Sequence, residues 1–242
     1  MNKQSFKPLR PRVVLGIAAH PDDLDFGASG TMAIWASQGA DVHYLILTDG
    51  SSGTEDKNIT PNELKKIRHK EQRTAVKIIG GKSVTFLDYP DGHLELTMGL
   101  KKDIVRIIRK LRPDVVITMD PSMIYSTSRG FINHPDHRVA GQAALDSVFP
   151  LARDYLAFPD LYKKGLKPHK TDTVLLTNFD SSNYVVDISA SFDKKIAALA
   201  AHASQVKDIS NIEPWLRQRA ELAGREQGYK LGESFIRLDI NH

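Results

Sequence analysis

The sequence VVLGIAAHPDD occupies residues 13–23 and joins seven apolar residues to a cluster of polar ones. A short apolar run without alternation is typical of a strand buried on both faces of a parallel sheet. Basic residues precede the run, as in a secretory signal, but it is short for a signal core and far too short to span a membrane. We therefore interpret residues 13–19 as the first strand of an α/β sheet, with HPDD at its carboxyl end.

Further apolar runs with the character of buried strands follow along the chain, at residues 42–48, 84–87, 115–119 and 173–177. Segments with helical spacing of apolar residues alternate with them, at residues 30–38, 63–79, 100–111 and 139–148. This alternation predicts a Rossmann-like α/β fold, in which a mostly parallel sheet is flanked by helices. Ligands of such sheets bind at the C-terminal ends of the strands, so we expect a metal site there.

The pattern becomes weaker after Pro150. We expect a short strand at residues 184–188 and a helix at residues 192–205. No linker or internal repeat divides the sequence. The prediction is a single α/β domain over residues 1–242, with a C-terminal extension from about residue 150.

The chain has 242 residues and no cysteine, which excludes disulfides, thiolate metal sites and a cysteine nucleophile. The net charge is +4, but the densest basic stretch, residues 65–77, also contains Glu71 and fits the polar side of a helix. We therefore expect no nucleic-acid partner. No stretch reaches transmembrane length, so we expect a soluble, cytoplasmic protein without a membrane partner, and the sequence leaves open whether it forms a homo-oligomer.

Two similar tetrapeptides carry the candidate chemistry: HPDD at residues 20–23 and HPDH at residues 134–137. Each places two side chains that can bind a metal three positions apart, in a turn stiffened by proline. Imidazoles and carboxylates form a ligand set suited to Zn²⁺ or a similar divalent metal in a protein without cysteine. The alternative is that Asp22, Asp23 or Asp136 only caps a following helix. Capping does not require either histidine, so the sequence favours a metal site.

At this point the sequence resembles the LmbE-like (PIG-L) N-acetylglucosaminyl deacetylase family. The two tetrapeptides carry the resemblance, together with FGASGT at residues 26–31 and TDG at residues 48–50. Weaker matches are Arg68-x-x-Glu71 and residues 195–205, so the similarity covers most of the chain. The sequence departs from the family pattern at Asp25, where the family often has Glu, and at Ser29, where it often has Gly.

The resemblance implies roles for individual residues. It implies metal ligands, namely His20, Asp23 and His137. It implies that Asp22 is the general base for the attacking water and that His134 stabilises the tetrahedral oxyanion and can protonate the leaving amine. It also implies that Arg68 contacts substrate hydroxyls or an anionic aglycone. One carboxylate and one imidazole beside a metal are a workable minimum for amide hydrolysis.

The function that this resemblance implies is removal of the N-acetyl group from an N-acetylglucosamine-type amino sugar or its conjugate, which would be the small-molecule partner. One alternative is a zinc hydrolase of another acyl-amide conjugate. Another is a non-catalytic sugar- or nucleotide-binding module, although no Gly-x-Gly-x-x-Gly follows the first strand. The sequence does not identify the aglycone.

The sequence leaves the roles of several polar residues open. His202 could be a core histidine or line the crevice, and Asp25 and Asp49 could orient ligand histidines or serve as turn and cap residues. The dipeptide Asp91-Gly92 is interpreted first as a tight turn, with substrate contact as the second option.

Overall fold

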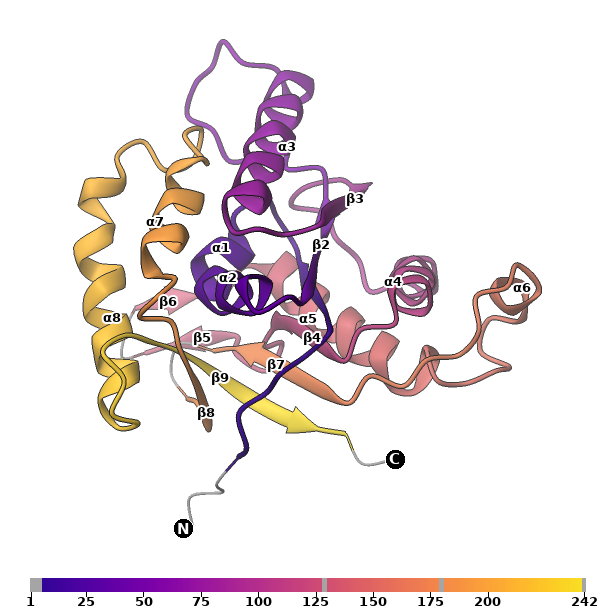
Figure 1. Cartoon of the computed structure of the whole chain (residues 1–242). Helices are drawn as coiled ribbons and strands as arrows, with labels where there is room; N and C mark the ends of the chain where they lie inside the picture. Colours follow the sequence, from indigo (N-terminus) through magenta and orange to yellow (C-terminus); the bar gives the residue numbers. More distant parts are fainter. Residues whose placement is uncertain (1–5, 128–129, 179–180, 241–242) are drawn as a thin grey trace.

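The computed structural model describes residues 6–127, 130–178 and 181–240. Its main sheet has seven strands in the order β3-β2-β1-β4-β7-β9-β8 (Figure 1). In chain order these strands are β1 Val13–Ala18, β2 Asp41–Thr48, β3 Ser83–Tyr89, β4 Val115–Met119, β7 Thr173–Thr177, β8 Tyr184–Asp187 and β9 Gly232–Asp239. The five strands from β3 to β7 are parallel to one another, and β9 is antiparallel to both of its neighbours. The predicted mostly parallel α/β sheet is confirmed.

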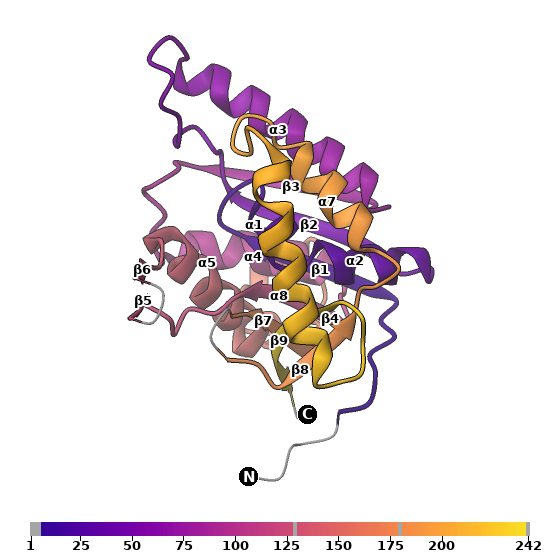
Figure 2. The same cartoon turned by 90° about the vertical axis from the view of Figure 1, so that its left-hand side faces the viewer.

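Helices cover both faces of this sheet (Figures 1 and 2). The longer ones are α2 Ser29–Ser37, α3 Pro61–Ile78, α4 Met98–Leu111, α5 Pro135–Asp146, α7 Phe192–Ala200 and α8 Glu213–Arg225. Shorter elements are α1 Asp23–Gly27, η1 Ser147–Leu151, α6 Pro159–Lys163 and η2 Ile209–Asn211. A two-stranded ribbon, β5 Tyr125–Ser126 and β6 Phe131–Ile132, precedes α5. None of the helices in the described ranges is both long and apolar enough to cross a membrane.

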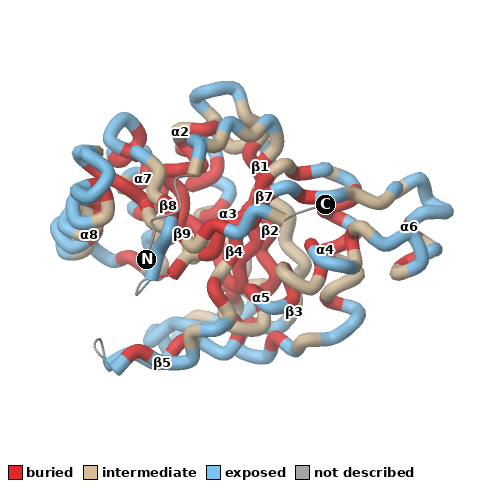
Figure 3. The backbone as a smooth tube through the Cα atoms, turned by 90° about the horizontal axis from the view of Figure 1, so that it is seen from below, coloured by how far each residue is buried: buried red, intermediate tan, exposed pale blue. Residues whose placement is uncertain are grey.

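The two faces of the sheet bury alternate residues of the same strands. On β1, Leu15 and Ile17 pack with α4 and α5, whereas Val14 and Ala18 pack with α2, α3 and α7. The strands therefore form the buried centre of the molecule, while α6 and the outside of α8 are largely exposed (Figure 3). This two-sided burial explains why the strand sequences are almost continuously apolar.

The part of the chain after Pro150 supplies β7, β8 and β9 to the same sheet. The expected helix at residues 192–205 is shorter and ends at Ala200, after which the chain turns. A buried ion pair ties this region to the first half of the chain, because Lys195 Nζ lies 2.7 Å from Glu233 Oε1. The Glu233 carboxylate also accepts the backbone N–H groups of Gly30 and Thr31 at the start of α2.

Because β1 to β4 are parallel, the segments that follow them meet at one edge of the sheet. The HPDD turn follows β1, and Asp49 follows β2. Asp91 lies just beyond β3, and His134 immediately precedes α5. Residues that are more than a hundred positions apart in the sequence therefore meet at this edge, as the sequence pattern predicts.

Candidate metal centre

The HPDD turn places its two aspartates in different directions. Asp22 is the residue before α1, and its backbone has φ 97°, a conformation that L-residues rarely adopt. The first turn of α1 closes on it, because the N–H groups of Asp25 and Phe26 donate to the Asp22 carbonyl. The next residue, Asp23, turns back and accepts the backbone N–H of His20 through Oδ2 at 2.7 Å. The turn is thus fixed by its own backbone bonds.

The HPDH segment begins α5. Pro135 occupies the first helical position, where its missing N–H costs nothing, so the helix starts earlier than the apolar spacing from residue 139 indicates. The Nδ1 atom of His134 accepts a hydrogen bond from the Asp136 backbone N–H at 3.1 Å and so caps the helix. His137, one helical turn later, lies on the same side as His134, and their ring centroids are 5.2 Å apart.

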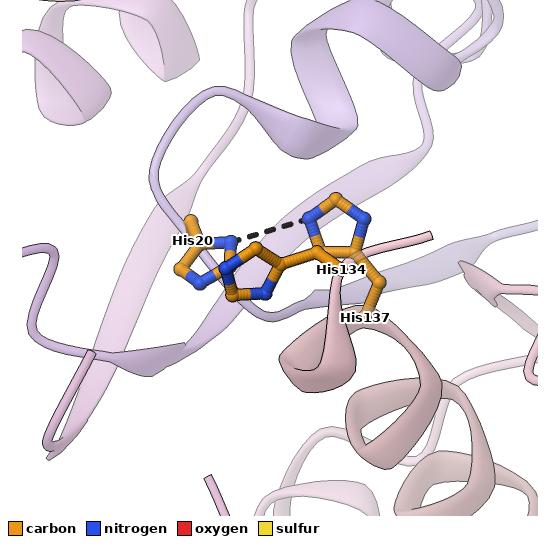
Figure 4. A group of neighbouring side chains, drawn as sticks. All are labelled: His20, His134 and His137. Atoms are coloured by element: carbon orange, nitrogen blue, oxygen red, sulfur yellow. Dashed lines mark hydrogen bonds between the residues drawn. The ribbon is translucent and has the colours of Figure 1, made fainter. Parts of the chain in front are cut away.

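The three predicted ligands come together at this point. His137 Nε2 lies 3.3 Å from His20 Nδ1 and 3.1 Å from Asp23 Oδ1, and His20 Nδ1 lies 3.5 Å from Asp23 Oδ2. In Figure 4 the rings of His20, His134 and His137 point toward one another, and the dashed line joins His20 to His137. Two ligands at ordinary zinc distances in a tetrahedron are roughly 3.3 Å apart. The donor atoms therefore fit one small divalent cation.

Carboxylates surround the other nitrogen of His20. Its Nε2 lies 3.1 Å from Asp91 Oδ1 and 3.2 Å from Asp136 Oδ2. Burial disfavours charge on His20, but Asp136, Asp23 and Asp91 outweigh it and raise its pKa to about 12. The same carboxylates would stabilise a divalent cation, and a carboxylate behind a ligand histidine fixes the orientation of its ring. Asp136 is itself held by the backbone N–H groups of Gly92 and Leu94.

Asp22 lies beside this cluster with a perturbed acidity. Burial and the charge of Asp23 raise its pKa to about 7, although Arg68 acts in the opposite direction. A carboxylate with a pKa in this range can both take and return a proton near neutral pH. His134 lies on the exposed side, with its ring centroid 4.7 Å from that of His20. Burial and the two neighbouring histidines lower the pKa of His134, which favours the uncharged imidazole.

Arg68 is buried rather than at the helix surface, with 4% of its area exposed. Its guanidinium donates to the carbonyls of Pro21, Gly50 and Ser52. It also lies 3.3 Å from Asp91 Oδ2 and 3.6 Å from Asp22 Oδ2. All six residues singled out by the family resemblance are thus in one site, but Arg68 faces protein atoms on several sides.

The structure gives different environments to the residues whose roles the sequence left undecided. Asp25 and His202 are fully buried and bonded to each other, with 2.8 Å between Asp25 Oδ2 and His202 Nε2. Within the described residues, Nδ1 of His202 has no hydrogen-bond partner. Asp49 serves as a turn residue, since it accepts the N–H groups of Ser51 and Asp91. Sequence reasoning assigned no role to Gln72, although it lies one helical turn after Arg68 on the same face of α3.

The sequence comparisons identify relatives for this arrangement. Residues 15–148 match the family model described as PIG-L, GlcNAc-PI de-N-acetylase. The chain is 35% identical over 243 residues to diacetylchitobiose deacetylase of Thermococcus kodakarensis, covering 96% of this chain and 87% of that protein. It is 30% identical over 206 residues to a probable N-acetyl-alpha-D-glucosaminyl L-malate deacetylase 2 of Bacillus anthracis, covering 80% of this chain and 81% of that protein.

Solved structures show the same similarity. N,N'-diacetylchitobiose deacetylase from Pyrococcus horikoshii, in complex with its inhibitor MPG, matches with a TM-score of 0.86 and 33% identity, over 95% of this chain and 84% of that chain. The 4-carboxy-2-hydroxymuconate hydratase GalB shares the fold, with a TM-score of 0.79 at 21% identity. Because one fold carries different named activities, the site has to decide the function.

Proposed function

Because the chain belongs to the PIG-L (GlcNAc-PI de-N-acetylase) family, we propose that it hydrolyses the N-acetyl amide of an N-acetylglucosamine-type amino sugar. The products are acetate and the free amine. One observation carries this proposal: a raised-pKa carboxylate, Asp22, and an uncharged imidazole, His134, lie beside three side chains whose ligand atoms fit a cation. Amide hydrolysis needs a group that deprotonates water and protonates the leaving amine, and a donor that stabilises the negative charge on the carbonyl oxygen.

His20, Asp23 and His137 would hold the cation, and Zn²⁺ is the first choice for two imidazoles and one carboxylate without a thiolate. When bound there, the cation would polarise the amide carbonyl and lower the pKa of a water molecule. The three side chains fit because their donor atoms are 3.1–3.5 Å apart and carboxylates surround His20. His134 lies on the exposed side of this cluster, which is the side from which substrate can enter.

Asp22 supplies the base. Its carboxylate takes a proton as the water oxygen attacks the carbonyl carbon. The carboxyl group can then give that proton to the nitrogen as the C–N bond breaks. Before a cation binds, a pKa of about 7 leaves neither protonation state of Asp22 strongly disfavoured near neutral pH, and a bound cation would favour the ionised base.

His134 stabilises the negative charge that develops on the carbonyl oxygen. Its Nδ1 accepts the Asp136 N–H, so the proton of the neutral ring is on Nε2. An Nε2–H group at the start of a helix is a donor for an oxyanion without being a cation. The family resemblance also implies that His134 can protonate the leaving amine. The lowered pKa of His134 favours the role of uncharged donor over that option.

We assign Arg68 to positioning. The family resemblance implies that Arg68 contacts the substrate directly. In the structure its guanidinium contacts the carbonyl of Pro21 and the carboxylates of Asp22 and Asp91. These contacts support a role in orienting the base and the loop after β3. Substrate hydroxyls would then not be the main contacts of the Arg68 guanidinium.

The test is a panel of N-acetylated sugars incubated with the purified, metal-loaded chain. N,N'-diacetylchitobiose is the first substrate, because it is named in a relative covered over 87% of its length. N-acetylglucosamine linked to malate or to inositol, and a simple N-acetyl amino acid, complete the panel. Equimolar acetate and primary amine from a sugar, with release at least about 100-fold slower in Asp22→Asn, support the proposal. Cleavage of only the N-acetyl amino acid would instead establish the other acyl-amide hydrolase.

A further inference from the structure

The backbone of Asp22 is strained, and a side chain from another helix holds it. Its φ of 97° is unfavourable for a residue with a Cβ, so surrounding contacts must over-determine it. One such contact is the Asp22 backbone N–H, which donates to Gln72 Oε1 at 2.9 Å. Gln72 is on α3 and fully buried. A side-chain amide from another helix therefore helps to hold the conformation of the residue assigned as the base.

The other end of that amide is bonded to a buried carboxylate. Gln72 Nε2 donates to Asp25 Oδ2 at 2.8 Å. Asp25 also accepts the Tyr44 hydroxyl at 3.1 Å through Oδ1, and His202 Nε2 lies 2.8 Å from its Oδ2. Tyr44 is 1% exposed, and the other three side chains are fully buried. Bonds of this kind are strong because water does not compete for them.

These contacts fix the direction in which the amide points. An ionised carboxylate only accepts hydrogen bonds, so the NH₂ group of Gln72 must face Asp25. The carbonyl oxygen of Gln72 then has to face the N–H of Asp22. The reversed amide would place a donor against the Asp22 N–H and an acceptor against the carboxylate, with two buried groups unsatisfied. Asp25 thus selects the orientation that holds Asp22.

We infer that Gln72 is a positioning residue for Asp22 and that Asp25 sets the direction of the Gln72 side-chain amide. The kinetic consequences of this inference rest on the proposed deacetylase function. Gln72 and Arg68 are four residues apart on one face of α3. Gln72 holds the backbone of Asp22, while Arg68 lies 3.6 Å from its carboxylate. Two side chains on one helix face therefore orient Asp22, one at its backbone and one at its carboxylate. Neither residue needs to touch the substrate to do so.

The first measurement does not depend on activity. In Gln72→Met, which has a similar shape but no oxygen, the amide proton of Asp22 loses its acceptor. Hydrogen exchange followed by NMR should show that proton exchanging at least ~10-fold faster. The Thr48 amide, which donates to the carbonyl of Ala19 just after β1, is the internal control and should not change. Unchanged exchange at Asp22 overturns the inference whether or not the chain deacetylates any sugar in the panel.

The second measurement is kinetic. Gln72→Met should lower kcat about 10- to 100-fold, with KM and metal content within about twofold, because a misplaced base affects the chemical step. Ser191→Ala removes a different buried hydrogen bond, to the Gly30 carbonyl, and controls for general destabilisation without a loss of kcat. In the Asp22→Asn background, Gln72→Met should have little further effect. An equal loss in both backgrounds would mean that Gln72 acts on something other than Asp22.

A pair of substitutions tests the polarity directly, and it also serves if Gln72→Met does not fold. Gln72→Glu puts two carboxylates against each other, so it should impair kcat and Asp22 amide protection. Asp25→Asn alone should impair them less, because its new amide can keep the oxygen toward Gln72 and turn the NH₂ group to the Tyr44 hydroxyl. In the double variant that NH₂ group can donate to the new carboxylate at residue 72, so one donor again faces one acceptor. Recovery of protection, and of kcat by about fivefold over Gln72→Glu, is expected. Additive losses in the double variant would contradict the assigned role of Asp25.

Discussion

His134 Nδ1 accepts the backbone N–H of Asp136 at 3.1 Å, so the residue that caps α5 is also the most exposed of the three imidazoles at the metal centre. A second proton on the ring would put Nδ1–H against that N–H. Burial and the charges of His20 and His137 lower the pKa of His134, and the bond from the Asp136 N–H also favours the neutral ring. The same bond leaves Nε2–H free to donate.

We therefore expect His134→Ala to lower kcat about 10²–10³-fold, the usual effect of removing one oxyanion donor. The basic limb of the pH profile of kcat/KM should stay, because His134 acts without a charge. His134→Asn retains an acceptor for the helix cap and serves as the control for stability. Loss of the basic limb in both variants would show instead that a protonated His134 is the general acid.

We expect the ionisation of Asp22 to determine the acidic limb of the pH profile of kcat/KM. Burial and the Asp23 charge raise the pKa of Asp22 to about 7, and the base must be ionised to accept a proton. Activity should therefore fall as the pH drops through that value, or through a lower one when the cation is bound, since a nearby positive charge favours the carboxylate. Asp22→Asn should lower kcat about 10²–10⁴-fold. Full activity of Asp22→Asn at pH 6 would mean that another residue is the base.

The metal ligands and the base should separate in a metal-binding experiment. His137→Ala removes a donor atom that lies 3.3 Å from His20 Nδ1 and 3.1 Å from Asp23 Oδ1, so it should lose stoichiometric zinc. Asp22→Asn should keep it. Elemental analysis and calorimetric titration of the chelator-treated proteins measure the difference. Equal loss of zinc from both would exchange the assigned roles of Asp22 and Asp23.

The sequence predicted most strands of the sheet and the chemical groups of the site for a physical reason. The strands at residues 115–119 and 173–177 are buried on both faces, so they are recognisable as apolar runs without their neighbours. HPDD and HPDH are local motifs that each carry ligand atoms. The parallel sheet brings them to one edge, and the predicted family is confirmed.

Features that depend on distant partners were not predictable in this way. Strand β9 carries Glu233 and Arg237, and its sequence is not apolar enough to indicate a buried strand. Glu233 is buried because Lys195 and the backbone N–H groups at the start of α2 meet its carboxylate. Gln72 and Asp25 are single polar residues whose meaning arises from a contact 47 positions apart in sequence. Asp91 was interpreted first as part of a turn, but its carboxylate also contacts His20 and Arg68.

Substitution of Arg68 can distinguish a residue that orients the site from one that binds the substrate. Its removal leaves the carboxylates of Asp22 and Asp91 without a cation at 3.6 Å and 3.3 Å, at positions that are largely buried. Loss of one partner of a buried ion pair typically costs about 3–5 kcal/mol, so Arg68→Ala should lower Tm clearly. Arg68→Lys keeps the charge but loses the forked donors that reach the carbonyls of Pro21 and Gly50.

If Arg68 positions Asp22, Arg68→Lys should lower kcat about 10- to 100-fold with little change in KM, because substrate binding is not its main contact. Steady-state kinetics on the best sugar of the panel, with the zinc content measured in parallel, give both constants. The opposite pattern, a raised KM with kcat retained, would mean that Arg68 binds the sugar equally in the ground and transition states. That result would restore the substrate contact implied by the family motif, and the orientation of Asp22 would then rest on Gln72 alone.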